Sequence, residues 1–345
     1  MLEPDGLRRR AGLSVDEIAP VWVLDDPRAG TSGQAIGVAE RLGVPHLRVP
    51  LAWNWHAHFA ALPARGSLRG LATSHGGARA WPFSAPRGPA LALSAGSRSQ
   101  AVALWLRSTF GTRIVHCMMP RLGYHAALFD LLIVSRHDRP PDVPNVLPVL
   151  GVTHRLSPLV LSQARVAWAG RLAHLPRPLV TLLVGGGLHG AEMRPAVANA
   201  IARKVATMTA SLGGSVLATT SRRTGAEATD ALAAGLAPSM HLLYRWGEPG
   251  ENPYAAFLGL ADAIVVTGDS VSMISEACGG EAPVFIISHG EEARHRRLHA
   301  SLYNAEQARP LDDNVSPWPR TPLDEAGRVA AEIRSRMSIG PQAVD

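Results

Sequence analysis

Cysteine, lysine and aromatic residues are all scarce in this chain of 345 residues. The two cysteines, Cys117 and Cys278, cannot make a disulfide framework, so we expect a reducing, cytoplasmic compartment. Aromatic residues make up 5% of the chain, and neither a zinc-finger spacing nor an RNA-binding aromatic motif occurs, so we expect no nucleic-acid partner. No run of about 18 apolar residues occurs either, which predicts that no helix spans a membrane.

Arginine supplies nearly all the positive charge, because Lys204 is the single lysine among 34 basic residues. Residues 1–160 hold 17 arginines against 10 acidic residues, whereas residues 161–345 hold 17 basic against 18 acidic residues. The net charge of +6 therefore comes from the first half. Such an excess favours an anionic partner, such as acidic lipid headgroups at the inner membrane surface or a phosphorylated substrate.

Short apolar runs alternate with segments of helical periodicity along the chain. This alternation is typical of a parallel sheet with both faces covered by helices. The pattern stops near a proline-rich segment and then restarts, which predicts an α/β fold of two Rossmann-like, doubly wound parallel-sheet domains that face a cleft. The predicted strands are residues 21–24, 46–50, 90–96, 113–118, 130–135, 145–151, 179–187, 215–221, 240–246, 262–268 and 283–288.

Composition also suggests the domain boundaries. Residues 1–19 lack the apolar core of a signal peptide, and we expect a loose tail there. The two domains are predicted over residues 20–156 and 179–320. A linker at residues 157–178 joins them, and a closing helix and tail follow at residues 321–345.

Two segments do not fit the alternation. Residues 51–89 combine five aromatic residues with several Gly and Pro, and they predict either a covered flap or an exposed apolar surface for an acceptor. Residues 289–320 are rich in His, Arg and Pro, and they predict a crossover connection.

A glycine loop follows the apolar run of residues 179–184 and precedes a predicted helix. It consists of Gly185, Gly186 and Gly187. Glycines let the backbone approach a ligand, and free N–H groups at a helix start attract phosphate. The loop has neither the GxGxxG spacing nor the Lys-Ser/Thr pair of a P-loop. Phosphate binding and a plain tight turn therefore both remain open.

A polar turn that includes Ser221 and Arg222 ends the predicted strand at residues 215–221. Hydroxyl groups beside the guanidinium groups of two consecutive arginines suit a diphosphate. The alternative is a capped helix start with solvated arginines.

The segment Asp269, Ser270, Val271 and Ser272 lies between a predicted strand and an apolar helix. Its serines can cap that helix, and the open N–H groups of the first turn attract phosphate oxygens. Glu276 lies about one and a half turns further along, where a carboxylate can accept two hydrogen bonds from a ribose diol. The alternative is a capped helix with one solvated glutamate.

Candidate catalytic groups lie in two loops of the first half. Asp26 belongs to a strand-to-helix loop, and His137 and Asp138 follow the strand at residues 130–135. A histidine beside a carboxylate at a cleft can act as a general base. The alternatives are ordinary turn chemistry for Asp26 and an exposed polar loop for the other pair. We expect no metal, because the nearby pair His56 and His58 has no cysteine or carboxylate beside it.

Six stretches of the sequence resemble the mitochondrial fission Elm family, and the resemblance spans about residues 20–338. They are WVLDDPRAGTSGQAIGVAERLG (22–43), FDLLIVSRHD (129–138), NVLPVLGVTHRLSP (145–158), VLATTSRRT (216–224), GENPYAAFLGLADAIVVTGDSVSMISEAC (250–278) and RRLHASLYNAEQARP (296–310). The family takes its name from a plant protein that recruits a dynamin-like protein to mitochondria. This arginine- and alanine-rich chain looks like a bacterial member.

The second half also resembles GT-B glycosyltransferases, such as the transferase that adds N-acetylglucosamine to the peptidoglycan lipid precursor. The resemblance implies that Ser270, Val271 and Ser272 meet the diphosphate of a nucleotide sugar and that Glu276 meets its ribose. It further implies that the glycine loop lies beside the donor and that Arg222 faces the phosphates, with no cofactor or metal required. One departure is the run Gly279-Gly280-Glu281-Ala282-Pro283, where the glycine that usually precedes the proline is displaced.

The sequence therefore predicts a metal-independent glycosyltransferase that uses a nucleotide diphosphate sugar. The second domain would bind the donor, and the first would bind an unknown lipid-linked or anionic acceptor. His137, Asp138 or Asp26 would serve as the base. Two alternatives stay open: a nucleotide-sugar 2-epimerase, which shares the GT-B fold, and a non-catalytic scaffold that binds a membrane or a protein.

Overall fold

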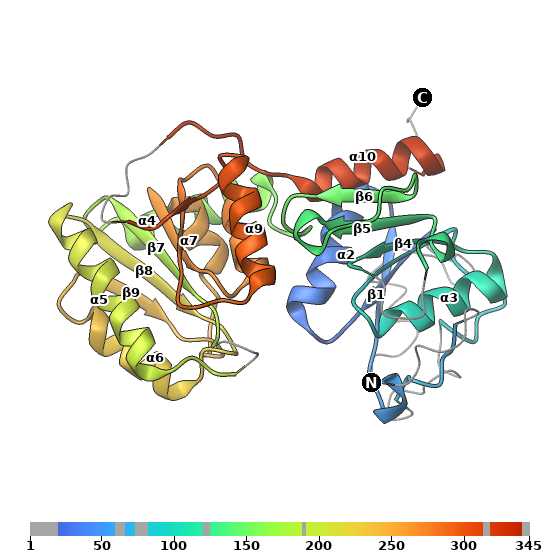
Figure 1. Cartoon of the computed structure of the whole chain (residues 1–345), viewed down its shortest axis with the longest axis horizontal. Coiled ribbons are helices and arrows are strands. Elements are labelled where there is room, and N and C mark those ends of the chain that lie inside the picture. The colour runs from blue at the N-terminus through green and yellow to red at the C-terminus, as the bar shows by residue number, and fades with distance from the viewer. Residues whose placement is uncertain are drawn as a thin grey trace. The chain divides into compact units, whose positions relative to one another are not determined.

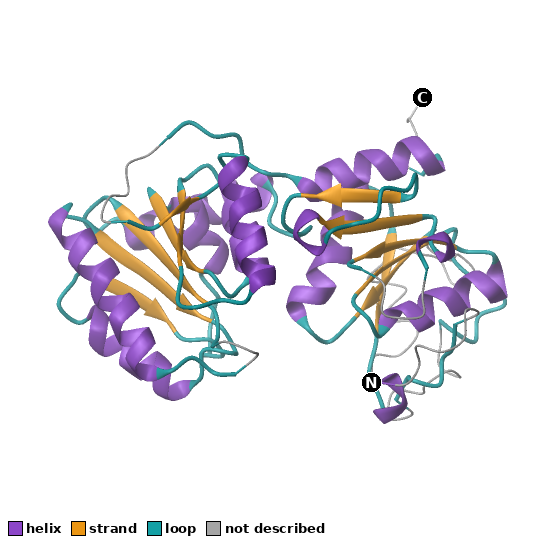
Figure 2. Cartoon of the chain, viewed as in Figure 1, coloured by secondary structure: helices purple, strands orange, loops and turns teal. Residues whose placement is uncertain are grey.

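The structure, a computed structural model, describes residues 20–58, 66–72, 82–119, 125–187, 191–312 and 318–339. The chain divides into two compact units, one of Met1–Arg155 with Glu325–Asp345 and one of Leu156–Asp324. In each unit a parallel sheet lies between helices (Figures 1 and 2). In the part of the chain described, no helix has the length and apolar character needed to cross a membrane.

The first unit contains a six-stranded sheet in the order β2-β1-β3-β4-β5-β6, and every neighbouring pair is parallel. Apolar runs form these strands because both faces of the sheet are buried. The strands are β1 (Val21–Asp25), β2 (His46–Pro50), β3 (Leu91–Ala95), β4 (Arg113–Cys117), β5 (Leu131–Ser135) and β6 (Val146–Val149). The helices are α2 (Ala29–Leu42), α3 (Ser99–Phe110) and α10 (Glu325–Met337), with short 3-10 turns η1 (Trp55–His58), η4 (Ala126–Leu128) and η5 (Arg136–Asp138).

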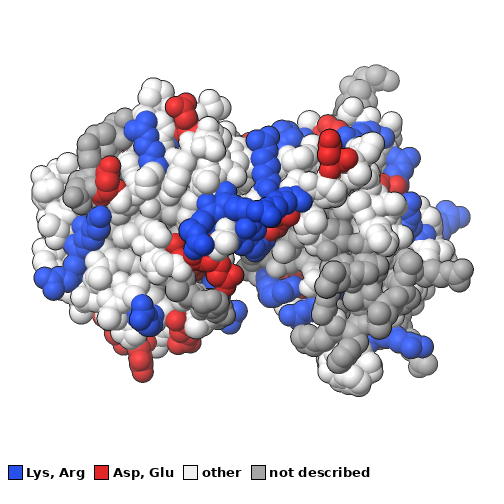
Figure 3. Space-filling model, viewed as in Figure 1, with Lys and Arg blue, Asp and Glu red and all other residues white. Residues whose placement is uncertain are grey.

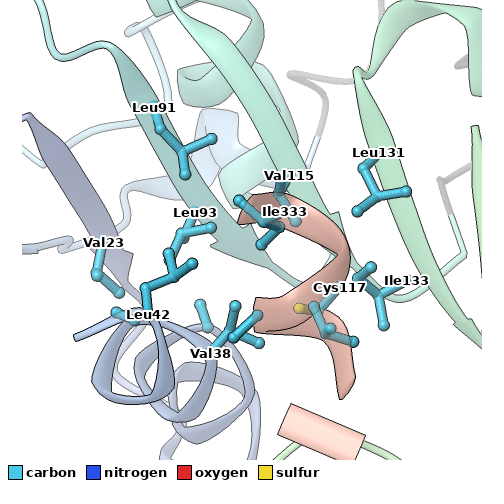
Figure 4. Close-up of a cluster of buried hydrophobic side chains, with 14 of the residues drawn as sticks. Val23, Val38, Leu42, Leu91, Leu93, Val115, Cys117, Leu131, Ile133 and Ile333 are labelled. Atoms are coloured by element: carbon cyan, nitrogen blue, oxygen red, sulfur yellow. The ribbon is translucent and has the colours of Figure 1, made fainter. Parts of the chain in front are cut away.

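The closing helix α10 belongs to the core of the first unit (Figure 4). Its residue Ile333 packs with Val38 and Leu42 of α2 against the apolar side chains of the sheet. Glu325 at its start accepts a hydrogen bond from the backbone N–H of Leu150 at 2.7 Å. The C-terminal helix therefore completes a sheet that the first half of the chain builds.

The second unit has its own six-stranded parallel sheet, in the order β12-β11-β10-β7-β8-β9. Its strands are β7 (Leu179–Val184), β8 (Ser215–Thr220), β9 (His241–Tyr244), β10 (Ala263–Thr267), β11 (Val284–Ile287) and β12 (Arg309–Pro310). Its helices are α4 (Pro158–Leu172), α5 (Pro195–Ser211), α6 (Ala226–Leu236), α7 (Tyr254–Leu260), α8 (Val271–Cys278) and α9 (Ala293–Asn304). The chain builds outward from β7 in one direction and from β10 in the other, so the strand order reverses between β7 and β10.

The prediction of an α/β fold with two Rossmann-like parallel sheets is confirmed, and each predicted strand overlaps an observed one. Helix α2 begins at Ala29, because the Arg28 carbonyl accepts hydrogen bonds from the backbone N–H groups of Thr31 and Ser32. The two-residue strand β12 escaped prediction because both of its residues are exposed and no apolar run marks it.

The segment predicted as a linker, residues 157–178, contains helix α4. The Ser157 side chain caps this helix by accepting the N–H of Val160 at 2.8 Å. Trp168 and Leu172 lie on one helix face and pack with Phe257 of α7. All of this segment belongs to the second unit.

The aromatic segment at residues 51–89 is only partly described, and Phe59 and Trp81 lie outside the described residues. Phe83 is buried, and Trp53 packs against the same apolar cluster. Trp55 is 67% exposed. Among the described residues, the segment therefore has both buried and exposed aromatic side chains.

Candidate functional site

The loops that follow β7 and β10 meet where the strand order of the second sheet reverses. Val266 of β10 pairs with Leu183 of β7, so both strands end at the same edge. The backbone N–H of Gly185 donates to the Thr267 hydroxyl at 2.8 Å, which joins the two loops directly. In open α/β sheets this reversal point, at the carboxyl ends of the strands, is where ligands bind.

Asp269 is the centre of this edge and is only 5% exposed. Its Oδ2 accepts hydrogen bonds from the Gly186 N–H at 2.7 Å and from Nη2 of Arg223 at 3.0 Å. Its Oδ1 accepts one from the Thr267 hydroxyl at 2.7 Å, and Nε2 of His289 lies 3.3 Å away. The carboxylate thus joins the ends of β7, β8, β10 and β11.

These contacts decide the charges of the cluster. Burial alone would raise the pKa of Asp269, but bonds from His289, Gly186 and Thr267 and the charge of Arg223 lower it below its usual value. Burial would likewise lower the pKa of His289, but Asp269 and the Glu291 carboxylate raise it. The cluster therefore favours an ionised aspartate beside a protonated histidine.

The glycine loop is tightly packed against the protein itself. A Cβ on Gly185 would lie 2.4 Å from Oδ1 of Asp269, and one on Gly186 would lie 2.5 Å from Cβ of Arg223. The N–H groups of Gly185 and Gly186 bond to Thr267 and Asp269, and that of Gly187 donates to the Ala191 carbonyl at 2.9 Å. The geometry of the loop matches the tight-turn alternative, since all three N–H groups already have protein acceptors.

The turn after β8 also closes on the protein. The Ser221 N–H donates to the Thr224 hydroxyl at 2.9 Å, and that hydroxyl donates to the Gly185 carbonyl at 2.6 Å. Arg222 is exposed, whereas the half-buried Arg223 turns toward Asp269. The structure therefore brings the second of the two arginines, and not the first, into the cluster.

Helix α8 begins at Val271, two residues after Asp269. Ser270 caps it, as the sequence predicted, by accepting the N–H of Met273 at 3.5 Å. Val271 and Ser272 occupy the first turn, where N–H groups lack partners within the helix. This turn, rather than the glycine loop, presents the backbone donors that suit phosphate.

Glu276 lies on α8 and accepts a hydrogen bond from the Tyr254 hydroxyl at 2.6 Å. Burial raises the pKa of Glu276 to about 7, although the bond from Tyr254 opposes the shift. Burial and the adjacent carboxylate in turn raise the pKa of Tyr254 well above its usual value. Sequence reasoning missed Tyr254 as a partner, because the pair is 22 residues apart and only the fold of α7 onto α8 joins it.

His289, Glu291 and His299 are further residues of this edge that sequence reasoning missed within the crossover at residues 289–320. The Glu291 carboxylate accepts hydrogen bonds from the Ser288 hydroxyl at 2.5 Å and the His289 N–H at 2.8 Å. The His299 ring nitrogen Nε2 lies 2.8 Å from the Gly268 carbonyl oxygen and ties α9 to the end of β10. No local motif marked these residues; their position after a predicted strand was the only signal.

Basic side chains surround the cluster. Figure 3 shows them gathered over α9, whose first turns carry Arg294, Arg296 and Arg297. A groove of about 410 Å³ between α5 and the end of β11 is lined by apolar side chains and by Lys204, Arg194 and His289. The groove borders His289 but not Asp269 or the start of α8, so the positive charge alone favours an anionic ligand at this edge.

In the first unit, Asp26 is 1% exposed and is held by its neighbours. It accepts hydrogen bonds from the backbone N–H and Nε of Arg28, both at 2.9 Å, and from the Trp53 indole at 3.0 Å. Burial would raise the pKa of Asp26, but Arg28 and Trp53 lower it. A carboxylate so stabilised is a weak base, and its contacts match the turn chemistry considered above.

His137 and Asp138 lie together in η5, with Nε2 of His137 3.6 Å from Oδ1 of Asp138. The other ring nitrogen of His137 contacts the Ser135 hydroxyl. The His137 side chain is fully buried, whereas 17% of the Asp138 side chain is exposed. The imidazole therefore does not face solvent, as a base that meets an acceptor hydroxyl must.

Comparison with known proteins finds one family whose model matches most of the chain. The family model for mitochondrial fission ELM1 matches residues 29–337. The Arabidopsis thaliana mitochondrial fission protein ELM1 is 26% identical over 281 residues, which are 73% of this chain and 64% of that protein. An uncharacterized protein of Rickettsia prowazekii (strain Madrid E) is 21% identical over 365 residues, covering 92% of this chain and 99% of that protein. The chain thus spans about two thirds of the plant relative and nearly all of the bacterial one.

Among solved structures, the UDP-GlcNAc 2-epimerase from Methanocaldococcus jannaschii is similar in fold. Its TM-score is 0.55 at 10% sequence identity, and the match covers 91% of this chain and 99% of that one. At this identity the likeness concerns the fold alone. Two Rossmann-like parallel sheets and this neighbour together give the chain a GT-B-like frame.

Proposed function

The chain belongs to the mitochondrial fission ELM1 family, and from this premise we propose that it is a glycosyltransferase whose second unit binds a nucleotide diphosphate sugar. One observation carries the proposal: the start of α8 and Glu276 lie at the reversal point of the second sheet. The first turn of α8 supplies backbone donors for phosphate, and a carboxylate lies farther along the same helix for a ribose diol.

The structure changes which groups would hold the diphosphate. The Gly186 N–H, which the sequence assigned to the ligand, already donates to Asp269. The N–H groups of Val271 and Ser272 take over that role in the proposal. Glu276 would accept hydrogen bonds from the ribose, with Tyr254 holding one of its carboxylate oxygens.

The proposed reaction is displacement at the anomeric carbon of the donor sugar. An acceptor hydroxyl forms the new C–O bond while the bond to the diphosphate breaks, and the diphosphate leaves with the bonding electron pair. Donors at the start of α8 stabilise the charge that develops on it. A base takes the hydroxyl proton, and Asp138 fits that role better than His137 or Asp26 because part of its side chain is exposed.

A thermal-shift screen tests the donor part of the proposal. Wild-type protein is heated with UDP, GDP, CDP and ADP and with their sugars. A ligand at 100 times its dissociation constant stabilises the fold by about 2.7 kcal/mol, which is readily measured. We expect one nucleotide series to raise the melting temperature, and Glu276→Ala to abolish that rise. Glu40→Ala is the matched control, because Glu40 is a surface carboxylate of the first unit that pairs with Arg155.

Product analysis then separates the candidate functions. Release of nucleotide diphosphate that depends on an added acceptor supports the transferase. Conversion of the nucleotide sugar to its epimer without an acceptor supports an epimerase, the activity named for the fold neighbour. If no nucleotide stabilises the protein, the proposal fails in favour of a non-catalytic scaffold.

A further inference from the structure

Asp269, the carboxylate that joins four strand ends of the second unit, has no role in the proposed chemistry so far. We propose that Asp269 is a positioning residue that orients Arg223, and that Arg223 is the cation which meets the ligand's diphosphate. This inference rests on the proposed function, because it concerns the same nucleotide site.

Arg223 is fixed at both ends of its side chain. The Cβ of Arg223 lies 2.5 Å from the position that a Cβ on Gly186 would take. The start of the Arg223 side chain therefore packs directly on the loop after β7. Its Nη2 donates to Oδ2 of Asp269 at 3.0 Å. The same oxygen accepts the Gly186 N–H, so one carboxylate oxygen sets both the loop and the guanidinium. A guanidinium held in this way loses little further freedom when it binds a ligand.

Arg223 is also accessible to a ligand. A guanidinium carries five N–H donors in a planar fork, and the bond to Asp269 uses one edge of it. The side chain is 35% exposed, so a ligand in solution can reach it. Asp269 directly precedes Ser270, the cap of α8, so the Arg223 head lies beside the turn that the proposal gives to the phosphates.

The remaining contacts of Asp269 limit how far its negative charge offsets the positive charge of Arg223. His289 lies on the opposite oxygen, Oδ1, and shares the negative charge of the carboxylate. His289 is in turn held by Glu291, 3.8 Å from its Nε2. Arg222, the neighbour of Arg223 in sequence, is exposed and would have to order its whole side chain to bind the diphosphate.

The test compares binding of a nucleoside diphosphate with binding of the corresponding nucleoside, by calorimetry, with the base found in the thermal-shift screen. We expect Arg223→Gln to reduce the preference for the diphosphate roughly ten- to hundredfold, as for a charge-assisted hydrogen bond. Nucleoside binding should stay unchanged. Asp269→Asn should lower the same preference, because the neutral amide removes the negative charge that pairs with Arg223 and leaves one acceptor oxygen in place of two.

The double variant distinguishes positioning from general structural damage. If Asp269 acts through Arg223, the variant with both changes should keep the same diphosphate preference as Arg223→Gln alone. A structural defect would weaken nucleoside and diphosphate equally. Arg245→Gln is the matched control, because it removes a second-unit arginine that pairs with Asp230 at the surface. Should Asp269→Asn fail to fold, Arg223→Gln still decides, since its side chain is partly exposed.

Each outcome has a defined meaning. An unchanged preference in Arg223→Gln overturns this inference while leaving the nucleotide site intact. Loss of the preference in Arg222→Gln, with Arg223→Gln unaffected, returns the role to the arginine that the sequence suggested. If the wild-type protein binds no nucleotide at all, the proposed function and this inference fall together.

Discussion

Asp26 and Asp269 are buried carboxylates that follow a strand beside the reversal point of their own sheet, one in each unit. Asp26 takes three of its bonds from Arg28, two residues away, and the fourth from Trp53. Asp269 takes its bonds from residues up to 83 positions away, on four different strand ends. The first aspartate stabilises one turn, whereas the second assembles an edge of the sheet.

The space beside these carboxylates differs as well. In the first unit, a Cβ on Gly96, after β3, would lie 2.6 Å from the Thr31 methyl group, so α2 packs closely on the loop after β3. In the second unit the reversal point is bordered by the first turn of α8 and the partly exposed Arg223. Both edges thus have a helix start and a partly exposed arginine beside the carboxylate, Arg28 in the first unit and Arg223 in the second, and they differ in the close contact of α2 with Gly96.

Replacing each aspartate by asparagine should give the largest difference between the units. We expect Asp269→Asn to cost about 3 kcal/mol of the free energy of unfolding, because the charges of Arg223 and His289 lose a buried partner. Asp26→Asn should cost about 1 kcal/mol, because Arg28 is 45% exposed and water can solvate it. Urea unfolding of both variants measures the two costs, and equal costs would contradict the comparison.

Alanine at glycine positions sharpens the same contrast. Gly185→Ala should destabilise by about 2 kcal/mol, because its Cβ would lie 2.4 Å from the Asp269 carboxylate. Gly33→Ala, inside α2 of the first unit, meets nothing within 4 Å and should stabilise by about 0.5–1 kcal/mol. Thermal unfolding of the two variants should therefore shift in opposite directions. A neutral Gly185→Ala would show that the loop relaxes away from Asp269.

The comparison also shows how far the sequence leads. Buried strands such as 130–135 can be predicted from the sequence because both faces of each sheet are covered. Ser270 can be predicted as a cap because its turn is local. The sequence does not predict which of Arg222 and Arg223 contacts Asp269, because consecutive arginines differ only in the direction they face. Tyr254 and His289 also escaped, since their partners lie 22 and 20 residues away and only the tertiary fold joins them.

The pKa of Glu276 predicts how nucleotide binding depends on pH. A carboxylate that accepts hydrogen bonds from a ribose must be ionised, and a pKa of about 7 leaves roughly a tenth of it ionised at pH 6. Nucleotide affinity should therefore fall about tenfold between pH 8 and pH 6. Glu276→Gln removes this titration, so any change of affinity with pH that the variant retains comes from the phosphate groups of the nucleotide. Calorimetric titrations of both proteins at the two pH values test the assignment, and identical slopes would refute it.

The smallest expected effect concerns His289. Asp269 and Glu291 raise its pKa in the folded state, so the stability gained from the protonated ring is complete below the unfolded pKa of 6.5. That stability is lost as the pH rises through the folded pKa. Urea midpoints should therefore fall from pH 6 toward alkaline pH in the wild type and fall less in His289→Gln. Parallel curves for the two proteins would mean that the histidine carries no charge in the fold.

Hydrogen exchange with and without the nucleotide found in the screen tests the central claim most directly, because it reports on the two units separately. The account predicts that the ligand slows amide exchange at Val271 and Ser272, in the first turn of α8, and around Arg223. It also predicts no change in the Asp26 loop of the first unit. Slowed exchange confined to the first unit, or a bound nucleotide that leaves the start of α8 unprotected, would contradict it.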